Sequence, residues 1–342
     1  MRNSLNKGVA ALTTTLLLAM TMMTSCGGKK AMNYTTTTGS TWGTFFTITY
    51  DGPASLDDSI VACLHRVDES LSPFNPNSIV SAVNNNNSME TDEMFTEVFE
   101  AAKKVNEISG GLFDPTVAPL VNLWGFGTTG ADLEPTDEEV AKAMESVGMQ
   151  DCYIEDGKVV KKSPDTAFDF SAISKGYGCQ SIGTMFKRNG CNNYMIEVGG
   201  EIVLSGKNPN GEDWVVMIDA PVENLDGTIL HSRLVKIATT DCSIATSGNY
   251  RNFHDTERHG RVGHTINPKT GYPIGTSTLS VTILAPDCTL ADALATACMA
   301  MPIFEAYELI DTMENVSGLF VVSSEEEGWK ILTTTSFPKF VN

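Results

Sequence analysis

The segment D-F-S-A-I-S-K-G, residues Asp169–Gly176, places a carboxylate six residues before a lysine, across a predicted strand-to-helix junction that ends on glycine. A second segment, A-D-A-L-A-T, places Asp292 and Thr296 four residues apart, on one face of a predicted helix. Carboxylate and hydroxyl oxygens are hard ligands that Mg²⁺ takes beside substrate phosphates. Lys175 adds a compact positive charge. Together the two segments predict a metal-assisted site that acts on a phosphate ester or anhydride.

The N-terminus predicts export. Arg2 and Lys7 precede an uncharged apolar run at residues 9–23, which is shorter than a typical transmembrane helix and has the length of a signal peptide core. Cys26 follows directly, so the segment resembles a lipoprotein signal in which residues 1–25 are removed and Cys26 is lipidated. An ordinary secretory signal with an incidental cysteine is the alternative. We therefore predict an exported protein, lipid-anchored to the membrane and facing the periplasm.

The remaining chain divides into a predicted tether at residues 26–40 and a domain at residues 41–342. No later stretch of sequence is long and apolar enough to span a bilayer. The mature chain, about 315 residues, is long enough for a full hydrophobic core in one large domain or two. Strand-like runs dominate its middle and helical patterns cluster outside it, which indicates an α+β fold.

The charge balance is strongly acidic. The chain carries 42 acidic and 23 basic residues, for a net charge of −19. Removal of residues 1–25 takes away only Arg2 and Lys7 and lowers this to −21. An acidic surface argues against nucleic-acid binding and repels anionic substrates at long range. A phosphate-bearing substrate must therefore be held by local devices, such as a metal ion, a lysine or backbone N–H groups.

The cysteines do not predict a zinc site. Seven cysteines follow Cys26, an odd number, and no C-x-x-C spacing occurs among them. We expect most of them to be buried as small hydrophobic residues. An exported chain can also form a disulfide, but the sequence does not select a pair.

Local patterns place several element boundaries. Thr136 and Glu139 have the spacing of a helix capping box. Thr91 and Thr289 are predicted to cap the helices that follow them. Residues 194–204 are predicted as one strand-like run.

A set of ordered segments resembles the ApbE-type FAD:protein FMN transferases. The segments are T-W-G-T from Thr41, S-G-G-L-F-D-P-T from Ser109, L-W-G-F-G from Leu123, D-F-S-A-I-S-K-G-Y from Asp169, E-V-G-G-E-I from Glu197, A-T-S-G-N-Y-R-N from Ala245 running to H-T-I-N-P-K-T-G from His264, and A-D-A-L-A-T from Ala291. The resemblance covers essentially all of the mature chain. Its specificity comes from the ordered set, since no single segment is specific.

The resemblance implies a two-lobed, T-fold-like α+β architecture with FAD in the cleft between the lobes and Mg²⁺ at its pyrophosphate. It implies that a Thr or Ser hydroxyl of an acceptor protein attacks the FMN phosphorus, that AMP leaves, and that FMN stays attached through a phosphoester. Acceptors in this family are flavoprotein subunits of membrane redox complexes, with a short motif that ends in a Gly-Ala-Thr-like stretch.

The resemblance also implies roles for individual residues. The metal ligands would be the Asp292 carboxylate, the Thr296 hydroxyl and the Ala172 backbone carbonyl. Contacts to FAD would come from Trp42, Leu112, Phe113, Asp114, Asp169, Lys175 and Ile266. Lys175 and the metal held by Asp292 would stabilise charge on the pyrophosphate, and His264 would stand near the transferring phosphate as a base.

This chain departs from the usual family pattern at four positions. Ser174 stands where alanine commonly precedes the lysine, and Trp42 stands where methionine is frequent. Asn267 and Asn249 replace acids in the segments that begin at His264 and Ser247. The predicted metal ligands and lysine are unaffected, whereas the two missing acids bear on how His264 is oriented.

Alternative interpretations remain open at the level of the sequence. An FAD pyrophosphatase, with water replacing the acceptor hydroxyl, or a non-catalytic flavin-binding lipoprotein would fit the same segments. Phe74 and Asn75 are predicted to line the flavin or adenine end of the site. Asp292 is expected to face the surface, so its replacement should leave the fold intact.

Overall fold

The computed structural model describes residues 33–52, 55–128, 134–220, 222–223, 229–230, 233–248, 253–275, 277–324, 326 and 328–341. The chain divides into two units, residues 1–33 and Tyr34–Asn342, and the second holds every element described below. The predicted signal peptide and Cys26 lie outside the described residues. Within the described ranges, no helix has both the length and the hydropathy needed to cross a membrane.

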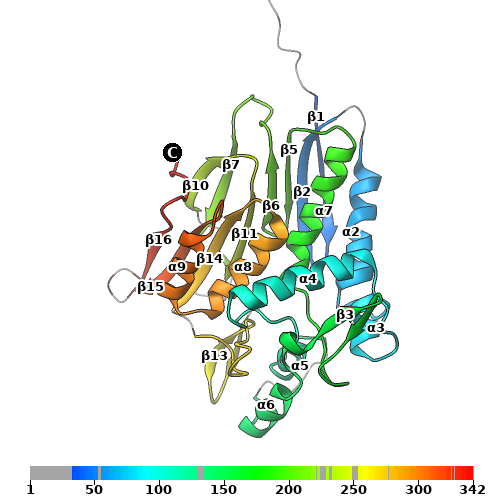
Figure 1. The fold of residues 1–342 in the computed structure, drawn as a ribbon. Helices are drawn as coiled ribbons and strands as arrows, with labels where there is room; N and C mark the ends of the chain where they lie inside the picture. The colour runs from blue at the N-terminus through cyan, green and yellow to red at the C-terminus, as the bar shows by residue number, and fades with distance from the viewer. Residues whose placement is uncertain are drawn as a thin grey trace, which may run out of the picture. The chain divides into compact units, whose positions relative to one another are not determined.

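An antiparallel sheet of eight strands forms the centre of this unit, in the order β1-β2-β5-β6-β11-β14-β15-β16 (Figure 1). Its strands are β1 (Tyr34–Thr41), β2 (Thr44–Asp51), β5 (Tyr194–Val198), β6 (Glu201–Ser205), β11 (Ser243–Gly248), β14 (Thr278–Ala285), β15 (Ser317–Ser324) and β16 (Gly328–Thr333).

Helices cover one face of this sheet. Figure 1 shows α2, α7, α8 and α9 along the strands, with α4 crossing below them. The helices are α2 (Asp57–Leu71), α3 (Ile79–Asn84), α4 (Glu93–Ile108), α5 (Ala118–Leu123), α6 (Asp137–Met144), α7 (Ser174–Arg188), α8 (Cys288–Ala300) and α9 (Ile303–Thr312), with a short 3-10 turn at Met149–Asp151. The α+β prediction is therefore confirmed. Contacts group Tyr34–Asn342 as one compact unit, and the two-lobed division stays a prediction.

The opposite face of the sheet is covered by a ribbon of two strands. This ribbon pairs β7 (Trp214–Asp219) with β10 (Arg233–Thr239) and packs its apolar side against Leu284 and Leu319 of the sheet. Three further two-stranded ribbons lie outside the layers: β3 (Tyr153–Glu155) with β4 (Lys158–Val160), β8 (Val222–Glu223) with β9 (Ile229–Leu230), and β12 (Phe253–Thr256) with β13 (Gly260–Gly263).

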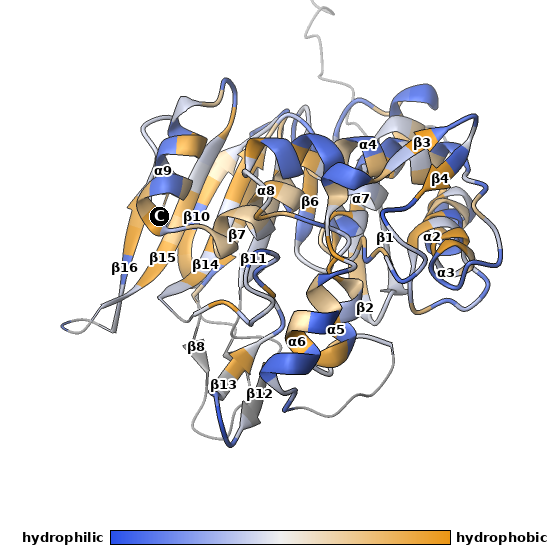
Figure 2. Ribbon diagram, turned by 60° about the horizontal axis from the view of Figure 1, so that its bottom comes forward, coloured by the Kyte–Doolittle hydropathy of each residue, from blue (hydrophilic) through white to orange (hydrophobic). Residues whose placement is uncertain are grey.

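The main core lies between the helices and the sheet. Phe95 and Phe99 of α4 pack against Phe168 and Phe170, which immediately precede α7. Figure 2 shows the apolar colouring of β14 and β15 and the banding of α9, whose buried residues Ala306 and Ile310 belong to this core. The seven cysteines from Cys63 to Cys298 are free thiols and six are buried, as expected for small core residues.

The predicted tether is wrong from Tyr34 onward. Residues 34–41 form β1, which pairs along its whole length with β2. Trp42 and Gly43 join the two strands with φ angles of 49° and 74°. This left-handed pair suits a two-residue hairpin turn, and the threonine-rich β1 sequence favours an extended strand. The stretch taken for a linker is the edge of the sheet.

Local capping agrees with the sequence in part. The capping box of Thr136 and Glu139 is present. The caps expected from Thr91 and Thr289 are instead made by the aspartates Asp92 and Asp287, whose side chains accept from backbone N–H groups three residues on. The run at residues 194–204 is not one strand but the hairpin of β5 and β6, because two glycines with positive φ turn the chain at Gly199–Gly200.

Helices α7 and α8 meet at unusually close range. A Cβ atom on Gly176 would lie 2.3 Å from the carbonyl oxygen of Cys288 and 2.7 Å from Cβ of Asp292. Both are closer than any allowed contact, and one is backbone. Later in α7, a Cβ on Gly183 would have its nearest neighbour at 3.5 Å, an ordinary contact distance.

These two glycines give a matched pair of substitutions in one helix. Gly176→Ala should destabilise the protein by about 1–3 kcal/mol, because α7 must move away from α8. Gly183→Ala should be neutral or stabilising by up to about 1 kcal/mol, because alanine is the better helix former. Chemical denaturation measures both free energies of unfolding. Equal effects at the two positions would contradict the close contact at Gly176.

Candidate active site

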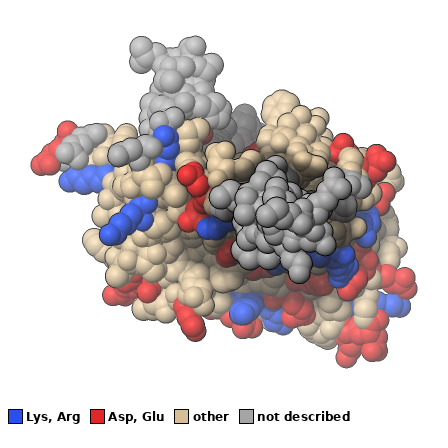
Figure 3. Space-filling model, turned by 90° about the horizontal axis from the view of Figure 1, so that it is seen from above, with Lys and Arg blue, Asp and Glu red and all other residues tan. Residues whose placement is uncertain are grey.

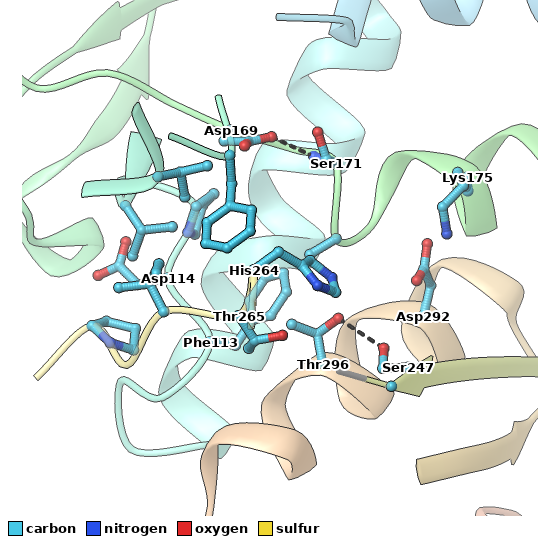
Figure 4. A pocket seen from close by; sticks show the side chains of 18 of the residues that line it. Phe113, Asp114, Asp169, Ser171, Lys175, Ser247, His264, Thr265, Asp292 and Thr296 are labelled. Atoms are coloured by element: carbon cyan, nitrogen blue, oxygen red, sulfur yellow. Dashed lines mark hydrogen bonds between the residues drawn. The ribbon is translucent and has the colours of Figure 1, made fainter. Parts of the chain in front are cut away.

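A cavity of about 390 Å³ opens where α7, α8 and β11 meet the loop after α4 and the segment after β13 (Figure 4). Ten of the residues to which the family resemblance gives a role line it: Leu112, Phe113, Asp114, Asp169, Ala172, Lys175, His264, Ile266, Asp292 and Thr296. These residues come from four separate parts of the chain, and the fold alone brings them together.

Helix α8 supplies the predicted metal-binding face. Asp292 and Thr296 lie one turn apart and both reach the cavity (Figure 4). The Thr296 hydroxyl is 3.1 Å from the Ser247 hydroxyl, and Asp292 Oδ2 accepts the Gly176 N–H at 2.9 Å. The expectation that Asp292 faces the surface is wrong, because its side chain is only 2% exposed. α8 is packed between the sheet and other helices, so its polar side chains Asp292 and Thr296 face the cavity rather than the protein surface.

The start of α7 forms the adjoining wall. Asp169 Oδ1 accepts the Ser171 N–H at 2.8 Å and so fixes the turn that leads into the helix. Ala172 and Lys175 then line the cavity on either side of the first helical residue, Ser174. The N-terminal end of a helix carries partial positive charge and favours an anion beside it.

The Lys175 side chain is held by a carboxylate that the sequence analysis did not predict. Its Nζ lies 2.5 Å from Oε1 of Glu201, the first residue of β6. Burial disfavours the ammonium, but the carboxylates of Asp292 and Glu201 outweigh that effect and raise the pKa of Lys175 above its usual value. Burial also raises the pKa of Glu201, against the opposing influence of Lys175. Lys175 therefore stays charged at the centre of the site.

Glu201 was missed although its segment was noticed. It occupies the first inward position of β6, where Val203 follows on the same side. A charged residue at a buried position of a strand is rare unless it is paired, and that pattern is the signal that identifies it. Ser247 with Gly248 was expected to let the backbone approach a ligand closely, but the place of its hydroxyl beside Thr296 was not predicted.

Asp114 lines the cavity, and both oxygens of its carboxylate accept hydrogen bonds from other residues of the protein. Oδ1 accepts from the backbone and hydroxyl of Thr116, and Oδ2 accepts the Met149 N–H at 3.0 Å. Burial raises the pKa of Asp114, and these hydrogen bonds oppose the rise. Its side chain therefore joins the cavity loop to the 3-10 turn, and the FAD contact of Asp114 stays a prediction.

Trp42 lies at an adjoining cavity of about 790 Å³. The second cavity shares Phe74, Ser171 and Lys175 with the first, and also includes Asn75. The indole ring packs over Gly178 of α7, where a Cβ would lie 2.4 Å from it. Lys175 thus stands at the junction of the two cavities.

His264 and Ile266 enter from the segment that follows β13. Figure 4 shows His264 in the middle of the cavity, between Asp169 and the α8 residues. Its ring meets Phe126 edge-on at a centroid distance of 6.4 Å. The Asn267 side-chain oxygen accepts the Lys269 N–H, a turn contact that aspartate would make equally well. Asn249 lies outside the described residues.

The donor set suits a small hard dication that is completed by substrate. Asp292 offers a carboxylate and Thr296 a hydroxyl, and Ala172, whose carbonyl is the third predicted ligand, also lines the cavity. Across the described ranges, no group of three or more His, Cys, Asp and Glu side chains could hold a metal by itself. Mg²⁺ characteristically takes one or two carboxylates and leaves its other positions to water and substrate phosphates. The residues present fit that ion.

Comparison with known proteins agrees with this arrangement. The FAD:protein FMN transferase of Vibrio cholerae is 33% identical over 98% of both chains, and that of Haemophilus influenzae is 30% identical over 88% of this chain and 90% of its own. The flavin transferase ApbE structure from V. cholerae superposes with a TM-score of 0.80 at 32% identity, covering 91% of this chain and all of its own. The apo flavinyl transferase ApbE of Pseudomonas stutzeri gives 0.79 at 27% identity, over 90% and 96%.

The family model named ApbE matches residues 42–320, a span that contains both cavities and every residue placed in them above. By this match and by its relatives, the chain belongs to the ApbE family.

Proposed function

We propose that this protein transfers FMN from FAD to a Thr or Ser hydroxyl of an acceptor protein, with Mg²⁺ at the site and AMP as the leaving group. The observation that carries the proposal is the place of Lys175, which lines both adjoining cavities. The activity of the relatives from V. cholerae and H. influenzae supports it.

Two adjoining cavities suit a dinucleotide. A single cavity of about 390 Å³ lies at the low end of the range for drug-sized ligands. FAD has a ring system at each end and a pyrophosphate in its middle. A molecule that extends over both cavities would therefore place its pyrophosphate at their junction, beside Lys175 and Asp292. Apolar walls such as Phe113 and Trp42 then lie on the two sides, where the rings need them.

The metal would be held by Asp292, Thr296 and the Ala172 carbonyl. Bound there, Mg²⁺ would neutralise charge on the pyrophosphate and favour departure of the leaving group. Lys175 adds a fixed positive charge from the other side, already oriented by Glu201. Because this ammonium is already oriented before the reaction, no free energy is spent on reorienting it as the transition state forms.

In the proposed transfer, the acceptor oxygen forms a bond to the FMN phosphorus as the bond from that phosphorus to the bridging oxygen of the pyrophosphate breaks. AMP leaves with the electron pair, and the acceptor hydroxyl gives up its proton. His264 is the proposed base, because it stands in the cavity and imidazole titrates near neutral pH. The product is an FMN phosphoester on the acceptor, a flavoprotein subunit of a membrane redox complex by the family resemblance.

We also propose that the protein is exported and anchored through a lipid on Cys26, facing the periplasm. The basic start, the uncharged apolar run and the cysteine directly after it support this. The described domain begins at Tyr34, so only a short segment would join it to the anchor.

Asp292→Asn tests the metal site. The amide keeps the hydrogen bond from Gly176 but loses the charge that holds the ion, so Mg²⁺-dependent turnover should fall on the order of a hundredfold or more. Steady-state rates across a Mg²⁺ series measure this, and thermal melting confirms folding. Asp287→Asn is the matched control on the same helix, because asparagine caps as well as aspartate and Asp287 lies outside the cavity lining. Equal rates for the two variants would remove Asp292 from the metal site.

The labelled product tests the reaction itself. Incubation with FAD, Mg²⁺ and an acceptor should add the mass of FMN less one water to a threonine or serine of the acceptor, with AMP released in equal amount. Intact-protein mass spectrometry and nucleotide chromatography measure both. Cleavage to free FMN and AMP at the same rate without acceptor would establish a pyrophosphatase instead. FAD binding without cleavage would establish a flavin carrier.

Lipidation is tested by Cys26→Ala in cells supplied with labelled fatty acid. The natural chain should take up label and sediment with membranes, whereas the variant should remain unlabelled. Entry of label into Cys26→Ala would contradict the assignment of this cysteine.

A further inference from the structure

The carboxylate of Glu201 is buried in an unusual state. Its side chain is 2% exposed, and Oε1 is paired with Lys175 at 2.5 Å. Oε2 is buried and, within the described part of the chain, has no hydrogen-bond partner. A buried carboxylate oxygen without a partner costs folding free energy, so its retention at a site needs an explanation beyond packing.

Two carboxylates face a single ammonium in this cavity. Figure 4 shows the Lys175 side chain directed toward Asp292, while its ion pair is with Glu201. One oxygen of Asp292 accepts the Gly176 N–H, and that bond leaves Oδ1 for another partner. The ammonium and a dication therefore compete for the same carboxylate. When the ammonium or the dication is bound at Asp292, the other binds there less favourably, because the two positive charges repel each other.

We propose that Glu201 is a positioning residue that holds the Lys175 ammonium away from Asp292 and so keeps this carboxylate open to Mg²⁺. The inference rests on the proposed function, since it requires the metal at Asp292. The Glu201 carboxylate pairs with the Lys175 ammonium and holds it at the cavity wall. Without that anion, Asp292 is the nearest counter-charge, and its pairing with Lys175 would block the ion.

The test measures Mg²⁺ affinity rather than turnover. Isothermal titration calorimetry with MgCl₂ is performed on protein saturated with FAD and without acceptor. Four forms make a double-mutant cycle: the natural chain, Glu201→Gln, Lys175→Met, and the two substitutions combined. Glu197→Gln is the matched control, because Glu197 lies in the same hairpin and accepts the Gly200 N–H but does not line the cavity.

Glu201→Gln should weaken Mg²⁺ binding roughly tenfold or more, the scale of coupling within one charge network. With Lys175→Met already present, adding Glu201→Gln should change the affinity by no more than about twofold, because Glu201 then has no ammonium to hold and the two substitutions are not additive. Glu197→Gln should bind Mg²⁺ as the natural chain does. Unchanged affinity in Glu201→Gln overturns the proposal. An equal loss in both backgrounds also overturns it, because Glu201 would then act on the metal directly.

Two further outcomes are decided by the same titrations. If Glu201→Gln does not fold, the comparison of Lys175→Met with the combined variant still decides: equal affinities support the proposal and a weaker combined variant overturns it. A natural chain that binds no Mg²⁺ with FAD present would overturn the metal-dependent function itself, and the flat titration would distinguish that failure from the failure of Glu201 as a positioning residue.

Discussion

Gly176 donates its backbone N–H to the buried carboxylate of Asp292, and the absence of a side chain there lets α7 rest directly on α8. Two parts of the chain 116 residues apart are joined by this bond. The contact sets the position of Lys175, one residue earlier, and turns Asp292 and Thr296 toward the same cavity. The metal-binding face, the lysine and the positive end of α7 are therefore placed by one helix contact, and their relative geometry cannot vary independently.

The charged residues of the site must bind an anionic substrate in a protein whose net charge is strongly negative. With a net charge of −19, the protein repels a pyrophosphate at a distance. Among the described residues that Figure 3 draws in colour, acidic and basic side chains are interspersed along the rim of this face. Attraction must therefore act at short range, through Lys175 and, in the proposed mechanism, a dication on Asp292. Two buried carboxylates look unfavourable for an anionic substrate, but one would hold the metal and the other is paired with the lysine.

The sequence predicted residues whose roles depend on local spacing. Asp292 and Thr296 follow from helical periodicity, and the α+β class follows from the order of elements. The sequence did not predict hydrogen-bond partners that are distant along the chain. The Asp114 carboxylate accepts from Met149, 35 residues away, and Lys175 pairs with Glu201, 26 residues away, and no local pattern encodes these contacts. The sequence prediction also failed at β1, because a threonine-rich stretch looks like a linker until β2 supplies the paired strand.

The devices that stabilise the leaving group do not distinguish transfer from hydrolysis. In the proposed reaction, Lys175 and a metal held by Asp292 and Thr296 would act on the pyrophosphate, and they would favour departure of AMP equally whether an acceptor hydroxyl or water attacks. The distinction must therefore lie on the side of the nucleophile, around His264. There the walls are aromatic: Phe126 meets the histidine edge-on, and Phe74, which is 62% exposed, lines both cavities. Apolar walls bind water weakly but can pack against an acceptor segment, whose binding free energy would carry its hydroxyl to the phosphorus. In the proposed transfer, selectivity over hydrolysis would therefore come from the aromatic walls rather than from the charged centre.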